Sequence, residues 1–345
     1  MRVLAVDVGG TKTAVAVADV VGSRSLRLVR EERYASAEHG GLEEILSSFL
    51  SRETRPPRFA GVGVAGPVQN GRARITKLPW GIDARLLQRK FRTTSFALVN
   101  DFVANALGLP YLKPRHVRAL ARGRPERNGP VALIGAGTGL GEAGLLWVGG
   151  RYEPFASEGG HTDFGPRNAR EERLAAFLRE RLGRAEWDRI LAGEGLGHLY
   201  DFLKSEGAAP EMPAVCAAFE REKDRAAVIS RLGLDGSDRL CREALTFFVS
   251  LYGSEAGNAA LQYRATGGVY VAGGIAPKIL PALEKGEFLE SFRSKPPLTE
   301  LLERIPVRVV LEPRLGLFGA AARAYRMAIE ATRPFSKIRA RLATR

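Results

Sequence analysis

The sequence predicts an α/β fold made of two similar lobes around one cleft. An apolar strand, a glycine turn and a second apolar strand begin at residue 3, and the same order begins again at residue 131. Elsewhere apolar strands are followed by helical segments, which is typical of α/β proteins. The length of 345 residues fits two domains of ordinary size.

The first lobe is predicted to open with three strands, followed by a helix, two further strands and a second helix. The strands cover 3–8, 13–20, 26–34, 59–64 and 96–99, and the helices cover 42–50 and 103–109. Leu42, Ile45 and Phe49 recur at the spacing that places apolar side chains on one helix face. The three opening strands are joined by tight loops, which suggests a meander that begins a mixed sheet.

The second lobe repeats this opening and then becomes mainly helical. Strands are predicted over 131–134, 145–148, 269–272 and 307–311, the helical part spans 169–261, and a last helix covers 317–329. We therefore expect a small lobe over 1–110 that is completed by 313–332, a large lobe over 111–312 with a helical insertion, and a basic tail over 333–345.

Composition excludes several classes of protein. The net charge of +14 comes mainly from arginines that are spread along the chain and mixed with acidic residues, which indicates a solvated basic surface and no nucleic-acid site. Cys216 and Cys241 stand apart from any histidine cluster, so we expect two buried structural thiols. No run of eighteen uncharged apolar residues occurs, and we expect a cytoplasmic protein that does not span a membrane.

The first glycine turn, Gly9-Gly10-Thr11, follows a strand that ends near Asp7. Glycines let backbone N–H groups approach an anion, and Thr11 and Lys12 can donate to phosphate oxygens. A carboxylate such as Asp7 fits beside phosphates when Mg²⁺ lies between them, directly or through water. The alternative is a plain hairpin turn.

Two further glycine turns are also candidates for binding the nucleotide. Residues 135–141 hold four glycines, more than a hairpin needs, and we expect Gly137, Thr138 and Gly139 to bind phosphate. The spacing is not that of a P-loop, and no helix follows directly. Gly273-Gly274 follows a strand whose end can receive adenine or ribose, although a simple strand-to-helix turn explains it equally well.

Candidate catalytic and sugar-binding residues follow other strands. Asn100-Asp101 ends a strand and begins a helix, so Asp101 is either an ordinary N-cap or a base that accepts a proton during phosphoryl transfer. Glu158 and His161 flank two glycines and offer the mixture of donors and acceptors that hexose hydroxyls require. A structural Glu–His pair is the alternative, and a metal site is disfavoured by the single histidine.

The motifs together resemble the bacterial glucokinase family, whose fold is that of the duplicated actin-like (ribonuclease H-like) ATPases. The matching stretches, in family order, are DVGGT (7–11), AGPV (65–68), LPW (78–80), NDF (100–102), GAGTGLG (135–141), EGGHTDF (158–164), GGVYVAGGI (267–275) and GLFGAA (316–321). The resemblance implies phosphorylation of the glucose 6-hydroxyl by ATP with Mg²⁺, and a homodimer. It places phosphates at both turns and assigns glucose contacts to Asn100, Glu158, His161 and Asp101, the last also as base.

The sequence departs from the family pattern in several places. A sugar-binding glutamate of the family falls on Asp188, with Glu186 nearby as a substitute; Lys77 stands where Asn is more frequent, and Glu142 where a small apolar residue is usual. Lys12 is also found in the related ROK kinases and repressors, but their cysteine-rich zinc motif is absent and no helix-turn-helix is expected before Val3. A kinase for another hexose or aminosugar, and a sugar sensor without activity, remain alternatives; Asp101 argues against the sensor.

Overall fold

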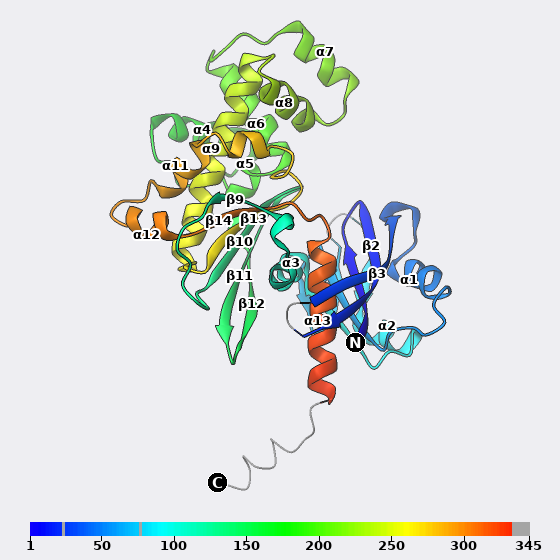
Figure 1. Cartoon of the computed structure of the whole chain (residues 1–345). Coiled ribbons are helices and arrows are strands. Elements are labelled where there is room, and N and C mark those ends of the chain that lie inside the picture. Colours follow the sequence, from blue (N-terminus) through cyan, green and yellow to red (C-terminus); the bar gives the residue numbers. More distant parts are fainter. Residues whose placement is uncertain (23–24, 76–77, 333–345) are drawn as a thin grey trace. The chain divides into compact units, whose positions relative to one another are not determined.

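The computed structural model describes residues 1–22, 25–75 and 78–332, and the chain divides into two compact units. Unit 1 comprises Met1–Leu112 and the chain from Pro313 onward, and unit 2 comprises Lys113–Glu312. Figure 1 shows that each unit contains its own sheet with helices packed against it. The mixture of helices and sheets confirms the predicted α/β class.

Unit 1 is built on a five-stranded sheet in the order β3-β2-β1-β4-β8. Its strands are β1 (Arg2–Val8), β2 (Lys12–Val21), β3 (Ser25–Ala35), β4 (Phe59–Val64) and β8 (Ser95–Asn100). The first three form an antiparallel meander, and β4 and β8 run parallel to β1. Side chains along β1 alternate between two cores, because successive residues of a strand point to opposite faces.

Helices cover both faces of this sheet. Those of unit 1 are α1 (Leu42–Leu50), α2 (Ala84–Lys90), α3 (Asp101–Gly108) and α13 (Leu315–Thr332), with short 3₁₀ turns η1 (Ser36–Glu38) and η2 (Leu109–Tyr111). One core joins the sheet to α1 and α2, and the other joins it to α3 and α13. A small antiparallel sheet of β5 (Val68–Gln69), β6 (Arg72–Arg74) and β7 (Gly81–Asp83) completes the unit. No sequence pattern predicted that small sheet.

Unit 2 contains a six-stranded sheet in the order β12-β11-β10-β13-β14-β9. Its strands are β9 (Val117–Ala121), β10 (Val131–Ala136), β11 (Leu140–Val148), β12 (Arg151–Ser157), β13 (Gly268–Ala272) and β14 (Val307–Val310). Here too an antiparallel meander is followed by parallel strands, with β9 added as an antiparallel edge. The order of unit 1 is therefore repeated, as expected for duplicated lobes. Strands β9 and β12 were not predicted.

The helical part of unit 2 packs on this sheet through one large core. Its helices are α4 (Ala169–Leu182), α5 (Trp187–Ile190), α6 (Gly193–Ser205), α7 (Pro213–Arg221), α8 (Arg225–Asp235), α9 (Arg239–Gln262), α10 (Leu280–Leu283), α11 (Glu287–Arg293) and α12 (Thr299–Arg304), with 3₁₀ turns η3 (Pro114–His116) and η4 (Gly159–His161). The long helix α9 contacts β10 and β13 (Figure 1). This arrangement confirms the predicted helical span.

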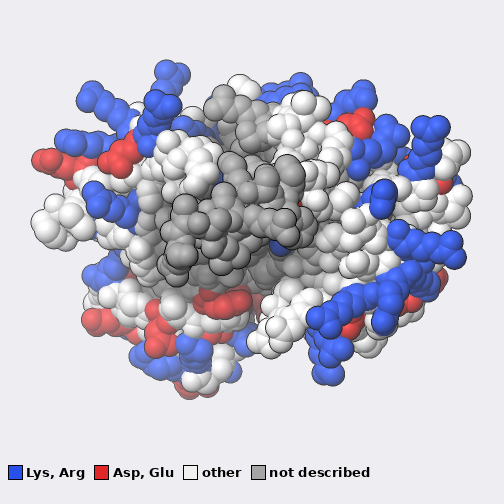
Figure 2. Space-filling view, turned by 90° about the horizontal axis from the view of Figure 1, so that it is seen from below, with Lys and Arg blue, Asp and Glu red and all other residues white. Residues whose placement is uncertain are grey.

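Several compositional expectations can be compared with the described residues. Cys241 is buried, but Cys216 is only half-buried, so the expectation of two buried thiols is wrong for Cys216; both thiols are free. Among the described helices none has the length and apolarity needed to cross a membrane. Figure 2 shows basic side chains spread over the described surface of one face with acidic ones among them. Lys77 and the tail over 333–345 lie outside the described residues.

Candidate active site

The first glycine turn closes the β1–β2 hairpin of unit 1. Val8 pairs with Thr13, and the Gly9 N–H donates to the Lys12 carbonyl at 3.0 Å. Ser36 braces the turn from the side: its hydroxyl donates to the Gly9 carbonyl, and its N–H donates to the Thr11 carbonyl, both at 3.0 Å. The turn is thus held in shape by bonds that leave the Thr11 side chain exposed.

Asp7 lies at the end of β1, against the start of α13. The approach is close, since a Cβ on Gly316 would lie 2.5 Å from Asp7 Oδ2. Burial raises the pKa of Asp7 to about 6, and the neighbouring Asp101 carboxylate contributes to that rise. The structure therefore brings Asp7 and Asp101 close to each other, on the ends of β1 and β8. Two adjacent carboxylates of this kind repel each other, and a bound cation would relieve the repulsion.

The N-cap of α3 is Asn100 and not Asp101. The Asn100 Oδ1 accepts hydrogen bonds from the Phe102 and Val103 N–H groups at 2.9 and 3.3 Å. Asp101 is the first helical residue, and its Oδ1 also lies 2.9 Å from the Phe102 nitrogen. Because Asn100 already caps the helix, the capping explanation for Asp101 loses its main support. The Asn100 amide nitrogen lies 3.4 Å from the Gly66 carbonyl, so both polar ends of this predicted sugar ligand contact the protein.

The second glycine turn closes the β10–β11 hairpin of unit 2. Gly135 and Gly141 pair with each other inside the strands, and the turn consists of Gly137, Thr138 and Gly139 alone. Only two of the four glycines in this stretch therefore lie in the turn itself. The Gly137 N–H donates to the Gly139 carbonyl at 2.9 Å, and the Gly137 carbonyl accepts from the Gly193 N–H at 3.0 Å. Gly193 begins α6, so a helix N-terminus, which favours anions, adjoins the turn.

Asp188 supports this turn directly. Its Oδ1 accepts a hydrogen bond from the Leu140 N–H at 2.6 Å, and a Cβ on Gly139 would lie 2.5 Å from the same oxygen. One carboxylate oxygen of this predicted sugar ligand is thus committed to the hairpin. No local sequence pattern indicated this contact, because the two segments are far apart in the chain.

Glu158 precedes the η4 turn and His161 is its last residue, and both are exposed. The His161 Nδ1 lies 3.5 Å from Oε2 of Glu186, which is buried and also pairs with Arg184 at 3.2 Å. The carboxylate beside His161 is therefore Glu186, and within the described part of the chain no structural Glu158–His161 pair forms. Metal-ligating atoms of His161, Glu186 and Asp188 lie within 4.8 Å of one another. Since Glu186 already faces arginines and Asp188 the Leu140 N–H, this group provides polar contacts rather than a free cation site.

Gly273 lies against the second turn. Its φ of +82° is one that glycine adopts readily, and a Cβ there would lie 2.3 Å from the Ala136 carbonyl oxygen. The Ile275 N–H donates to that carbonyl at 3.2 Å. Around Gly274, by contrast, a Cβ would meet nothing within 4 Å, so open space adjoins the end of β13. The pair thus lies where β10 and β13 both end.

Two lobes of similar strand order, each with a short glycine turn after its first meander strand, define an actin-like ATPase. Comparisons with known proteins identify the family within this class. The glucokinase family model matches residues 4–327. A glucokinase of Trichormus variabilis is 38% identical over 338 residues, which cover 94% of this chain and 99% of that protein.

Solved structures agree with the sequence comparison. A glucokinase from an Antarctic psychrotroph superposes with a TM-score of 0.83 at 28% identity, covering 94% of this chain and 99% of that one. A ROK family glucokinase from Streptomyces griseus, solved with glucose and AMPPNP, shares the fold with a TM-score of 0.63 at 21% identity, covering 94% and 100%. The chain belongs to the glucokinase family.

Proposed function

We propose that the protein transfers the γ-phosphoryl group of ATP to the 6-hydroxyl of glucose, with Asp101 as the base that accepts the hydroxyl proton. The observation that carries this assignment lies at the start of α3, where Asn100 caps the helix and Asp101 lies beside Asp7. A carboxylate placed there can accept a proton as the phosphoryl group transfers.

Unit 1 supplies groups that bind the phosphates of ATP and the metal ion. Gly10, Thr11 and Lys12 bind phosphate oxygens through a backbone N–H, a hydroxyl and an ammonium. Gly9, whose N–H donates to the Lys12 carbonyl, lets the backbone approach the phosphates closely. Asp7 would hold Mg²⁺, directly or through water, because its carboxylate oxygens and its repulsion from Asp101 fit a hard divalent cation. When bound, Mg²⁺ neutralises charge on the phosphates.

Unit 2 supplies the groups that recognise the two substrates. Gly137, Thr138 and Gly139 bind phosphate beside the N-terminus of α6, and Gly273-Gly274 accommodates the nucleoside. Glu158 and His161 bind glucose hydroxyls; in unit 1 the candidates for glucose contacts are Asn100 and Asp101. Glu186 orients His161, and Asp188 offers its remaining oxygen to the sugar.

The resemblance to glucokinases also supports two broader expectations. A homodimer and a cytoplasmic location both stay predictions. They affect neither the choice of base nor the assignment of the sugar ligands.

A coupled assay of ADP release tests the function directly. Mg-ATP would be combined in turn with glucose, mannose, fructose and N-acetylglucosamine, and glucose is expected to give the highest kcat/KM. Turnover with none of the sugars would overturn the kinase assignment. A preference for another sugar would favour the second candidate, a kinase for a different hexose or aminosugar. The engagement of Asp188 with Leu140 is the observation that keeps this candidate open.

A further inference from the structure

Two carboxyl groups are buried in unit 2, and one of them contacts the segment that carries the predicted sugar ligands Glu158 and His161. Glu142 on β11 and Glu255 on α9 are each only 2% exposed. The Tyr263 hydroxyl lies 2.9 Å from Glu142 Oε2 and 2.7 Å from Ser157 Oγ. Neither glutamate has an arginine or lysine within ion-pair distance among the described residues. Buried carboxylates without such a partner carry a large desolvation cost, so their position calls for a physical explanation.

Glu142 is in direct contact with the segment that carries Glu158 and His161. A Cβ on Gly159 would lie 2.1 Å from Glu142 Oε2, so only glycine leaves room for the carboxyl group at this point. The Gly159 N–H donates to Ser157 Oγ at 3.0 Å, which connects the segment to Tyr263 and Glu142. A movement of the Glu142 carboxyl group is therefore transmitted to the backbone next to Glu158.

A single proton would stabilise the two carboxyl groups. Glu142 Oε1 is buried and receives no hydrogen bond from a donor among the described residues. The Glu255 carboxyl group is close enough to form a hydrogen bond with Glu142 when one of the two is protonated. Burial raises the pKa of Glu255 to about 8, and the charge of Glu142 contributes to that rise. Burial also raises the pKa of Glu142. The pair is thus more stable with one proton than with none.

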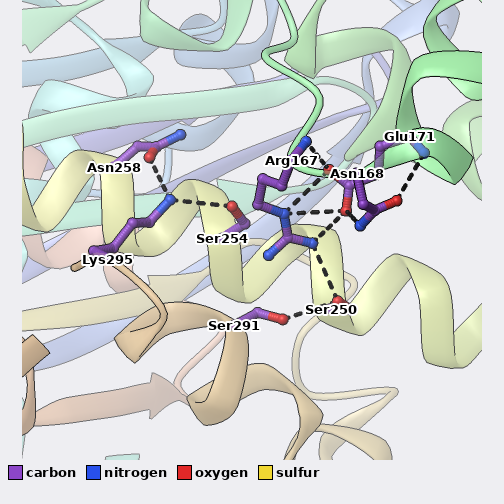
Figure 3. A network of polar contacts seen from close by, with 8 residues as sticks. All are labelled: Arg167, Asn168, Glu171, Ser250, Ser254, Asn258, Ser291 and Lys295. Carbon is purple, nitrogen blue, oxygen red and sulfur yellow. Dashed lines mark hydrogen bonds and ion pairs between the residues drawn. The ribbon is translucent and has the colours of Figure 1, made fainter.

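Other titratable groups surround the pair without neutralising it. Burial raises the pKa values of Tyr252 and Tyr263, so both phenols stay neutral through the alkaline range. Burial lowers the pKa of Lys295, whose ammonium contacts Asn258 and Ser254, as Figure 3 shows, and neither carboxyl group. The Asn258 amide donates to Glu255 at 2.6 Å. Lys295 therefore contacts the carboxyl pair only through Asn258. Its own titration has to be separated from that of the two carboxyl groups.

We propose that Glu142 and Glu255 share one proton and act as positioning residues, which hold the Ser157–Gly159 backbone in the geometry that presents Glu158 and His161 to glucose. This inference rests on the proposed function of the same site. Loss of the shared proton leaves two buried anions that repel each other. The Ser157–Gly159 backbone next to Glu142 is then no longer held in one conformation. The expected consequence is weaker glucose binding at alkaline pH, with ATP binding unchanged.

The direction of the pH effect follows from the protonation states. The folded protein binds the Glu255 proton more tightly than the unfolded chain does, so this contribution to stability is present in acid and disappears as the pH rises through about 8. If only the protonated pair binds glucose well, KM for glucose rises up to about tenfold between pH 7 and pH 9, because each pH unit above the pKa lowers the protonated fraction tenfold.

The test compares glucose KM from pH 6 to 9.5 in four proteins. Wild type and Lys295→Arg are expected to show the same rise, because the guanidinium of that variant does not titrate in this range. Glu255→Gln removes the carboxyl group whose pKa lies near 8 and offers an amide donor to Glu142, so its KM should stay flat. In Glu142→Gln no second anion repels Glu255, so the rise in KM should be smaller than in wild type. A rise in Glu255→Gln that superimposes on wild type would overturn the proposal, as would its absence in wild type or in Lys295→Arg.

A measurement on wild type alone covers the case in which the glutamine variants do not fold. Amide hydrogen exchange over 157–162, corrected for intrinsic base catalysis, should lose protection between pH 7 and pH 9.5, while β1–β2 of unit 1 keeps its protection. Unchanged protection over 157–162 would contradict the proposal. This readout needs no turnover, so failure of the inference and failure of the kinase function are distinguishable.

Discussion

The two glycine hairpins have the same architecture but different chemistry around them. In unit 1 the turn after β1 is braced by the Ser36 hydroxyl, and Asp7 stands two residues before the turn. In unit 2 the turn after β10 is braced by the Asp188 carboxylate, and the position two residues before it is Gly135. The hairpin of unit 1 therefore carries its carboxylate, Asp7, on its own first strand. In unit 2 the carboxylate is that of Asp188, which contacts the start of the second strand at Leu140.

This difference gives the two lobes different local electrostatics. Asp7 and Asp101 concentrate negative charge at the ends of β1 and β8, which suits a cation and a base. In unit 2 the carboxylate of Asp188 faces a backbone N–H, and the N-terminus of α6 adjoins the turn, which suits the binding of phosphate. Variants of individual carboxylates and hydroxyls can test each part of this division.

The largest effect is expected from Asp101→Asn. An amide cannot accept the sugar proton, so kcat should fall roughly 10²- to 10⁴-fold while glucose binding remains detectable. Steady-state ADP release gives kcat, and calorimetry gives the glucose affinity. Asp83→Asn, at the N-cap of α2, is the matched control and should keep normal activity, because Asn caps a helix as well as Asp. Near-normal kcat in Asp101→Asn would exclude the base assignment.

A smaller effect is expected from Glu158→Gln, in the proposed sugar-binding segment of unit 2. Replacing a charged acceptor by a neutral one weakens a hydrogen bond to a glucose hydroxyl, so glucose KM should rise about 10- to 100-fold with little change in kcat. Glu153→Gln on the preceding strand, β12, is the control and should leave KM unchanged. If kcat falls and KM does not change, Glu158 acts in the transition state and the separation of tasks between the units is incomplete.

Much of the architecture could be predicted from the sequence because its signals are local. The apolar strands, the helical spacing of Leu42 and Ile45 and the restart at residue 131 each depend on neighbouring residues, and the structure confirms them. Strand β12 was missed, since its alternation is interrupted by Pro154 and its side chains are mostly half-buried. The edge strand β9 likewise lacks a continuous apolar run.

The environment of the site depends on contacts that no local pattern reveals. Asp188 contacts Leu140 across 48 residues, and Glu142 approaches Tyr263 across 121. The importance of Glu186 could be suspected from its place two residues before Asp188, but its burial beside His161 needed the fold. The sequence thus identified candidate residues, while their burial and partners came from the structure.

Substitutions of Asp188 separate its two roles. Asp188→Ala removes the bond to the Leu140 N–H, so the turn should loosen and KM for ATP should rise about tenfold, which corresponds to roughly 1.4 kcal/mol. Asp188→Asn keeps an acceptor oxygen and should preserve KM for ATP. Both constants would be measured with glucose and with ATP varied separately. A change in glucose KM alone in both variants would show that sugar binding, and not support of the turn, is the main role.

The smallest effect is expected on stability, from Ser36→Ala in the hairpin of unit 1. Ser36 is fully buried, and its hydroxyl contacts the Gly9 carbonyl and the Thr13 hydroxyl, both at 3.0 Å. Removing it leaves the buried Thr13 hydroxyl and the partly buried Gly9 carbonyl without that partner, which should lower the free energy of unfolding by about 2 kcal/mol in a urea titration. Ser51→Ala removes an exposed hydroxyl and should change the unfolding free energy by less than about 0.5 kcal/mol. Equal effects in the two variants would show that the first turn keeps its shape without the hydroxyl, as the second one does.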